Sequence, residues 1–442
     1  MLTSDEQALL ATVDSLQESL IERTADLVRI PTVNPYSGDA SAATEAPGQE
    51  WITRQFERLG ARVFRVPVPP DVYQRGGVIG PPDRSWEGRD NVVAEWRIGS
   101  GHGPTILLND HMDTVGTEGM EFDPFEPVIR DGRMYGRGTS DTKGNMVAGL
   151  TAIEAFLRFR PQVNGRILFE SVVDEECNGG GAGTLACCLA GVRGDFVIAL
   201  DGSRGTVDTG CNGVATARVR VRGRAGHSSV GESVNAIDKA IVAKGVIDAF
   251  AREHRQRFPN CMVNIGVFRA GTLPAIVPDM AEMQINLSYD ITDAEEARKR
   301  TGHWGGALFR ARFEKALSQL SKADPWFADY PAEVSWIKDL YPYRCDPNDP
   351  LIRMAAQAAT DAFGEPVELK PMTAWADAAH LARHLGVPVA GMGAGTPGEA
   401  HTAHEYVVLD DLVKGAKAVA LTIHRFFVGW PFPGAGKRDG ES

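Results

Sequence analysis

The chain has 442 residues, of which 43% are apolar, so it can bury a substantial core in two or three domains. Its formal net charge of −12 argues against nucleic-acid or anionic-membrane partners, because such binding depends on Lys and Arg that neutralise phosphate. No stretch approaches the roughly 20 apolar residues of a membrane span, and the acidic start MLTSDEQ does not resemble a signal peptide. The six cysteines form no CxxC pair, which is typical of reduced thiols. We therefore expect a soluble cytoplasmic protein that acts on small molecules.

The first half of the chain alternates between helical and strand patterns. Apolar residues recur at helical spacing over residues 6–28 and predict an N-terminal helix. Short apolar runs predict buried strands at residues 106–108, 166–173, 196–200 and 387–390, with helical patterns at residues 145–159 and 184–189. This alternation predicts an α/β domain with a mostly parallel sheet.

Polar residues follow each of these predicted strands directly. The clusters are Asn109–Asp113, Asp174–Glu176, Asp201, and a glycine-rich loop that contains His401 and His404. In open α/β sheets, ligands bind beyond the carboxyl ends of the strands, so these clusters are expected to converge at one edge. The convergence predicts a functional site there.

The pattern changes near residue 215 and predicts a second domain. Its expected elements are a strand, a helix, two strands, a helix and a strand, at residues 216–222, 234–254, 262–269, 281–290, 294–320 and 333–338. This βαββαβ order is that of a ferredoxin-like split βαβ sandwich. We therefore expect a catalytic domain made of residues 1–211 and 341–442, with an α+β domain of residues 212–340 inserted into it.

The residue types at the predicted sheet edge are those that bind zinc. Zinc takes His nitrogen and carboxylate oxygen in a nearly tetrahedral array and keeps one position for water at catalytic sites. His111 and Asp113 lie two residues apart on an extended segment, so Asp113 is expected to hold the second ring nitrogen of His111. Taken alone, such an HxD pattern is more often a turn at a strand end.

Further acids offer complementary chemistry. Asp141 lies in the glycine-rich stretch 136–144, which lacks P-loop spacing, and its two carboxylate oxygens could each bind one of two metal ions. Of the adjacent acids Glu175 and Glu176, one can bind metal while the other acts as a general base toward water. The remaining candidate ligands are Asp201 and one of the histidines His401 and His404.

The chain resembles the M20 family of metallopeptidases and deacylases over nearly its whole length. The motifs that carry the resemblance are His111-Met-Asp113, Gly138-Thr-Ser-Asp-Thr-Lys-Gly144, Asp174-Glu-Glu176, Asp201, Ala225-Gly-His-Ser-Ser229 and Ala400-His-Thr-Ala-His-Glu-Tyr406. The family includes acetylornithine deacetylase, succinyl-diaminopimelate desuccinylase, aminoacylase and glutamate carboxypeptidase. The resemblance implies a hydrolase with two divalent metal ions, zinc being the expected metal and cobalt or manganese the alternatives.

The resemblance also implies a role for each matching residue. One ion would be bound by His111 and Asp201, the other by Glu176 and His401, and Asp141 would bridge them. Glu175 would be the general base, and Asp113 would orient His111. In dimeric members the counterpart of His227 reaches the partner's active site to stabilise the oxyanion. We therefore expect a homodimer formed through the inserted domain, which would also serve as a lid.

Several positions depart from the family pattern. Ala275 stands where many members have Asn, and Ser288 where many have Arg; in the family both positions help to grip the substrate's α-carboxylate. Since Arg is the best bidentate carboxylate donor, its absence favours an amide substrate without that carboxylate, or one gripped by another base. Trp375, near Asp377, replaces a smaller residue and could be core or an aromatic wall, and His404 could be a surface residue or a substrate contact.

The leading interpretation is an N-acyl deacylase. An exopeptidase or dipeptidase on the same fold is the alternative, because peptidase members tend to have Asp at the position of Asp201 and deacylases tend to have Glu. A non-catalytic protein with a relict metal site is disfavoured, because Glu175 and all five candidate ligands are present.

Overall fold

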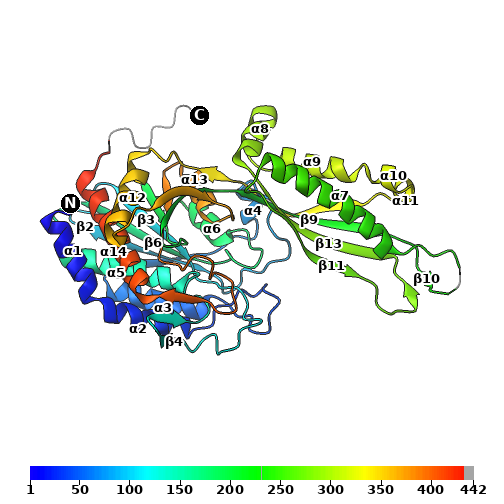
Figure 1. Ribbon diagram of the computed structural model, residues 1–442. Helices are drawn as coiled ribbons and strands as arrows, with labels where there is room; N and C mark the ends of the chain where they lie inside the picture. The colour runs from blue at the N-terminus through cyan, green and yellow to red at the C-terminus, as the bar shows by residue number, and fades with distance from the viewer. Residues whose placement is uncertain (230, 433–442) are drawn as a thin grey trace.

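The computed structural model describes residues 1–229 and 231–432, which form a large and a small domain (Figure 1). In the large domain, nine of the described strands form one sheet, in the order β1-β2-β6-β3-β7-β17-β8-β15, with β16 beside β8. Their bounds are β1 Arg62–Val66, β2 Asn91–Ile98, β3 Thr105–His111, β6 Gly165–Val172, β7 Phe196–Ala199, β8 Thr206–Cys211, β15 Tyr343–Arg344, β16 Glu368–Met372 and β17 Val389–Gly391.

The centre of this sheet is parallel. Strand β3 pairs in parallel with β6 and with β7, and β7 pairs in parallel with β17, whereas β1, β2 and β15 run antiparallel to their neighbours. Strand β3 is buried along its whole length, which explains its uninterrupted apolar run in the sequence. The predicted α/β fold with a mostly parallel sheet is confirmed, and the carboxyl ends of β3, β6 and β7 lie at one edge.

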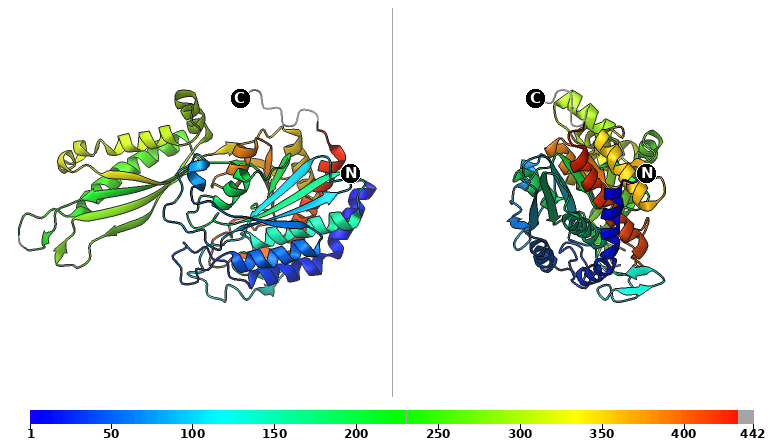
Figure 2. Two further views of the ribbon diagram at one scale, coloured as in Figure 1. Left: turned by 180° about the vertical axis from the view of Figure 1, so that it is seen from behind. Right: turned by 90° about the vertical axis from the view of Figure 1, so that its left-hand side faces the viewer.

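Helices flank this sheet on both sides (Figure 2). One group of helices in mutual contact comprises α1 Ser4–Ser15, α2 Gln17–Val28, α5 Lys143–Phe159, α12 Pro350–Phe363 and α14 Leu409–Gly429. In a second group, α6 Ala182–Leu189 contacts α4 Val72–Arg75 and α13 Ala378–Leu385, while α3 Ala46–Arg58 packs on β1 and β2.

The N-terminal segment differs from its prediction, since residues 6–28 form parts of two helices that meet at Leu16. The Leu16 N–H donates to the Val13 carbonyl at 2.9 Å, and the Leu16 side chain is 4% exposed. The break allows α1 to contact α14 as well as α5, whereas α2 packs mainly on α5. Apolar spacing stays helical on both sides of such a break, so periodicity alone does not reveal it.

The small domain contains a four-stranded antiparallel sheet in the order β11-β13-β9-β14. Its elements are β9 Gly213–Arg222, α7 Ala236–Arg257, β11 Val263–Ala270, β13 Met280–Tyr289, α8 Ile291–Thr301, α9 Ala307–Leu317, α10 Leu320–Ala323, α11 Trp326–Asp329 and β14 Glu333–Leu340. The expected helix at 294–320 is divided after α8 by Gly302, whose φ of 76° ends the helix. A short pair, β10 Gly226–His227 with β12 Ile276–Val277, lies at the tip far from the large domain (Figure 1).

Each domain has its own apolar core. The chain passes into the small domain after β8 and leaves it after β14, and we keep residues 212–340 as its proposed extent. A third sheet joins β18 Tyr406–Val408, β5 Arg133–Tyr135 and β4 Val128–Arg130 within the large domain. Among the described helices, none combines the length and apolar character that crossing a membrane requires.

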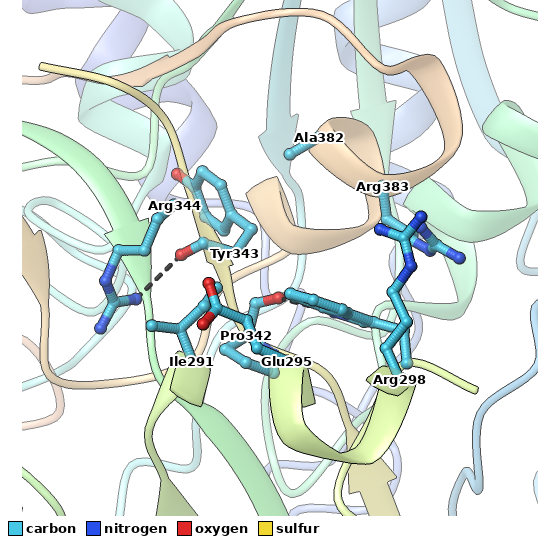
Figure 3. A pocket seen from close by; sticks show the side chains of 9 residues that line it. Ile291, Glu295, Arg298, Pro342, Tyr343, Arg344, Ala382 and Arg383 are labelled. Atoms are coloured by element: carbon cyan, nitrogen blue, oxygen red, sulfur yellow. Dashed lines mark hydrogen bonds between the residues drawn. The ribbon is translucent and has the colours of Figure 1, made fainter. Parts of the chain in front are cut away.

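A cavity of about 210 Å³ lies where the two domains meet. Figure 3 shows Arg298 and Arg383 on one side of it and Arg344 on the other, where Arg344 donates to the Tyr343 carbonyl at 2.8 Å. None of the predicted metal ligands lines this cavity, so it is separate from the candidate site.

Candidate metal centre

The Asp141 carboxylate lies between two histidines. Its Oδ1 is 3.2 Å from His111 Nε2, and its Oδ2 is 3.2 Å from His401 Nε2. His111 ends β3, and Asp141 lies in the loop before α5, so residues far apart in the sequence meet at the predicted sheet edge. One carboxylate with an oxygen directed at each imidazole is the arrangement expected of a residue that bridges two cations.

Glu176 completes the group of potential ligands. Its Oε2 lies 3.0 Å from His401 Nε2, and ligand atoms of His111, Asp141 and Glu176 all lie within 4.8 Å of one another. Asp201, just after β7, lines a small cavity together with His111 and Glu175. The structure therefore brings all five predicted ligands and the predicted base to one region.

The pKa values of these groups are shifted because several acids lie close together in a buried part of the large domain. Hydrogen bonds that the His401 ring donates to the carboxylates of Asp141 and Glu176 raise the pKa of His401 to about 11. Burial and the nearby Asp141 charge raise the pKa of Glu176 to about 7 and that of Asp201 to about 6. Burial likewise raises the pKa of Glu175 well above its usual range.

The donor set fits divalent cations. The Nε2 atom of His111 is buried and makes no hydrogen bond of acceptable geometry, although it is directed at Asp141. A buried imidazole nitrogen that faces a carboxylate without a well-formed hydrogen bond requires an explanation, and imidazole with carboxylate is a set that zinc, cobalt or manganese accepts. Bound cations would also relieve the repulsion among Asp141, Glu176 and Asp201.

The group that orients His111 is the backbone carbonyl of Asp113, whereas the carboxylate of Asp113 was expected. The Nδ1 of His111 lies 2.9 Å from the backbone carbonyl of Asp113, whereas the Asp113 carboxylate is 3.8 Å away. That carboxylate instead accepts from Asn34 Nδ2 at 2.7 Å and from the backbone N–H groups of Glu175 at 3.3 Å and Glu176 at 3.1 Å. Asp113 thus holds the turn that carries both glutamates.

A second buried acid, Glu405, holds the loop of Asp141. Its carboxylate accepts hydrogen bonds from the N–H groups of Gly138, Ser140 and Asp141 at 2.9–3.0 Å and from Arg137 at 2.6 Å. Glu405 is fully buried and follows His401 closely in the chain, so it joins the loops of two candidate ligands. The sequence reasoning missed this role, although the Glu-Tyr end of the histidine motif marked the residue.

Asp174 is a further supporting acid that the sequence reasoning did not resolve. It forms an ion pair with Arg84 and accepts from Tyr73 Oη at 2.9 Å, while Arg84 also donates to the Cys177 carbonyl at 3.0 Å. Asp174 and Cys177 both have positive φ, 70° and 56°, an uncommon conformation for residues other than glycine. Tyr73 comes from α4 and Arg84 from the loop between α4 and β2, and both side chains fix this turn.

Three residues that the sequence singled out lie apart from the cluster. His227 is exposed in β10 at the tip of the small domain, where its Nδ1 accepts from the Ser229 N–H at 3.1 Å (Figure 1). Ala275 lies at the same tip, since its carbonyl accepts from the Ser228 N–H at 3.1 Å. His404 is exposed, and its N–H donates to Thr402 Oγ1. Within one chain, none of these side chains joins the group around Asp141.

A cleft of about 620 Å³ opens beside the candidate metal ligands. Glu175, Glu176 and His401 line it from the large domain, and Asn264, Asn286 and Lys338 line it from the small domain. Trp375 is half-buried and also lines the cleft, so it forms an aromatic wall instead of belonging wholly to the core. The cleft can hold a small molecule against Glu175.

Comparison with known proteins agrees with this geometry. The model of peptidase family M20/M25/M40 matches residues 107–425. The chain is 27% identical to N-formyl-4-amino-5-aminomethyl-2-methylpyrimidine deformylase of Halalkalibacterium halodurans, over 95% of this chain and 97% of that protein. It is 27% identical to succinyl-diaminopimelate desuccinylase of Thioalkalivibrio sulfidiphilus, over 74% and 84% respectively. A di-peptidase structure from Saccharomyces cerevisiae shares the fold, with a TM-score of 0.74, 16% identity and coverage of 97% and 100%.

Proposed function

The chain is a hydrolase of the M20/M25/M40 peptidase family that acts on C–N bonds, and we propose that it cleaves an amide of a small N-acylated molecule at a dinuclear metal site. The observation that carries the proposal is the Asp141 carboxylate, with one oxygen directed at His111 and the other at His401. His111 and Asp201 would hold one ion and Glu176 and His401 the other. Zinc is the proposed metal, with cobalt or manganese as alternatives.

The protein side chains supply the proton transfers of this proposed reaction. Two divalent ions, when bound, would polarise the amide carbonyl and make the attacking water more acidic. Glu175 lines the cleft, and burial raises its pKa, so its carboxylate is basic enough to take a proton from water and return it to the leaving nitrogen. Asp113 holds the backbone of Glu175 and Glu176, which keeps the base and its neighbouring ligand in a fixed relation.

We further propose that the substrate is an acylated amine without an α-carboxylate, a formyl group being the favoured acyl group. The Ser288 hydroxyl accepts from the Met262 N–H at 2.6 Å, so it is engaged within the sheet. No arginine is among the residues that line the described cleft. Two relatives aligned over nearly all of the chain are named as deformylases of an aminopyrimidine derivative.

A hydrolysis panel with zinc-loaded protein tests this proposal. It compares the N-formyl, N-acetyl and N-succinyl derivatives of an amine with the same derivatives of the corresponding amino acid. Dipeptides are a third class of substrate in the panel. A substrate α-carboxylate that enters the cleft gives up hydrogen bonds to water and meets no arginine there. A hydrogen bond to a charged group is worth about 1.5–3 kcal/mol, so we expect kcat/KM for the amides without an α-carboxylate to exceed that for the N-acyl amino acids by about tenfold or more. Preference for dipeptides would favour the exopeptidase alternative, and preference for N-acyl amino acids would contradict the substrate assignment.

We propose that two copies pair through the small domain, so that His227 of one copy reaches the site of the other. Within one chain His227 and Ala275 are at the tip, away from Asp141. Exposed apolar side chains on the same domain include Ile241, Leu273 and Ile276, which are 58%, 62% and 45% exposed. Exposed apolar side chains that adjoin one another are typical of a surface that binds a partner, and Ile276 is paired in register with His227. The mass of the protein in solution by light scattering tests this pairing.

A further inference from the structure

A row of polar side chains crosses the whole sheet of the small domain. Asn264 of β11 is paired in register with Asn286 of β13, Asn286 with Thr216 of β9, and Thr216 with Lys338 of β14. The next residue along β9, Ala217, is fully buried in the core under the helices, so the row lies on the opposite, open face. We call Asn264, Asn286, Thr216 and Lys338 the polar row.

A bulge in β14 places Lys338 in this row. Trp336 pairs with Ala217 and Lys338 pairs with Thr216, so Ile337 is an extra residue between two consecutive pairs. Without the bulge, Ile337 would stand opposite Thr216 and Lys338 would turn toward the helix-covered core, because side chains alternate along a strand. The bulge therefore turns the Lys338 side chain toward the large domain.

Two members of the row are joined to the turn that carries Glu175. Lys338 Nζ donates to the Gly179 carbonyl at 3.1 Å, and Thr216 Oγ1 lies 3.2 Å from Asn178 Oδ1. Lys338 is only 6% exposed. These contacts fix the polar row relative to Glu175, the proposed general base. Among the described residues that line the cleft, Lys338 is the only Lys or Arg, and its ammonium group is engaged by the Gly179 carbonyl.

The other two members, Asn264 and Asn286, are exposed in the cleft. They stand directly opposite each other on adjacent antiparallel strands, where Cβ atoms are about 5 Å apart. A carboxamide has one acceptor oxygen with two lone pairs and two donor hydrogens, and the Asn286 Oδ1 uses one lone pair to accept from Thr216 Oγ1 at 3.3 Å. The remaining donors and acceptors match an amino group beside a ring nitrogen, as a carboxamide does on adenine. Trp375 provides an aromatic surface in the same cleft, and its Nε1 is fixed by donation to the Tyr341 carbonyl at 3.2 Å.

We propose that Asn264 and Asn286 bind the leaving-group end of the substrate, and that this end is a neutral planar nitrogen heterocycle with adjacent hydrogen-bond donors and acceptors. Trp375 contacts the face of the ring while the two carboxamides bind its edge. The aminopyrimidine named for the similar deformylase is a ring of this class. This assignment rests on the proposed amide hydrolysis and identifies the residues that select its substrate.

The test uses two formamides of similar size on the zinc-loaded full chain. One is N-formyl-4-amino-5-aminomethyl-2-methylpyrimidine, and the other is N-formylbenzylamine, whose ring has no hydrogen-bonding edge. We expect Asn264→Ala and Asn286→Ala each to lower kcat/KM for the pyrimidine by about three- to tenfold, mainly through KM, because each variant loses a neutral hydrogen bond. Turnover of the benzylamide should stay within about twofold of the wild type.

Gln284→Ala is the matched control, since Gln284 lies on the same face of β13 beyond the cleft and should leave both rates unchanged. Equal losses on both formamides, or no loss on either, would overturn the role of the two asparagines. A wild type that cleaves N-acyl amino acids or dipeptides but neither formamide would overturn the heterocycle assignment while leaving the hydrolase intact. A zinc-loaded wild type that cleaves no amide at all would refute the proposed function itself, and the inference with it.

Discussion

Replacing Glu405 by Gln should weaken both the fold and metal binding, although Glu405 touches no metal in the proposed site. Its buried carboxylate receives three backbone N–H groups and the Arg137 guanidinium. Glutamine keeps the shape, but it removes the charge and replaces one acceptor oxygen by an N–H2 donor facing other donors. Arg137, 2% exposed, would then lose its charged partner in a buried place.

The size of the effect follows from these contacts. Breaking one partner of a buried ion pair costs about 3–5 kcal/mol, which is a large part of the roughly 5–15 kcal/mol that stabilises a typical domain. The loop from Gly138 to Asp141 would also lose the acceptor that fixes it. Because supporting contacts of metal ligands are worth about 10- to 100-fold in affinity, we expect zinc affinity to fall by that factor.

Urea unfolding and competition with a chromophoric chelator measure the two effects separately. Asp410→Asn is the control, because Asp410 lies just beyond the same loop, is 72% exposed and pairs with Lys414 at the surface. Surface pairs of this kind contribute about 0–1 kcal/mol, so the control should resemble the wild type in both measurements. Unchanged zinc affinity in Glu405→Gln, with stability within about 1 kcal/mol of the wild type, would refute the reasoning.

Other perturbations test the base, the pairing of chains and a buried acid. Glu175→Ala should keep its metal content near that of the wild type while turnover falls by about 10²–10⁴-fold, and retained turnover would exclude Glu175 as the base. If His227 acts across a dimer, His227→Ala alone should lose activity, and mixing it with Glu175→Ala chains should restore part of that activity. If it does not, His227→Ala alone should keep the activity of the wild type. Glu170 is fully buried on β6, accepts from Asn109 at 3.0 Å, and has its pKa raised by burial to about 8. The folded chain thus retains this proton after the unfolded chain has released it, so stability falls as pH rises from about 4.5 to 8, by about 3 kcal/mol at pH 7. Glu170→Gln should remove that fall in urea titrations across this range, and an unchanged pH profile would contradict the buried-acid account.

The sequence was sufficient for the fold class, and it marked the candidate ligands that the structure brings to one edge of the sheet. Parallel strands in the middle of a sheet are buried on both faces, so they appear as apolar runs, and the polar residues after each run mark one edge. His111 follows this rule at the end of β3, as does Asp201 just after β7. Information of this kind is local, because it depends only on the spacing of apolar residues within a strand or helix and on the residues that follow its end.

The tertiary structure decided what depends on distant partners. The division of the N-terminal helix at Leu16, the bulge that turns Lys338 toward the catalytic domain, and the contacts of Glu405 with the Asp141 loop have no local signature. The free energy of a buried charge is set by the groups that surround it in space, and those groups come from remote parts of the chain. The sequence therefore determined which side chains reach the sheet edge, and only the folded chain determined which of them orient one another.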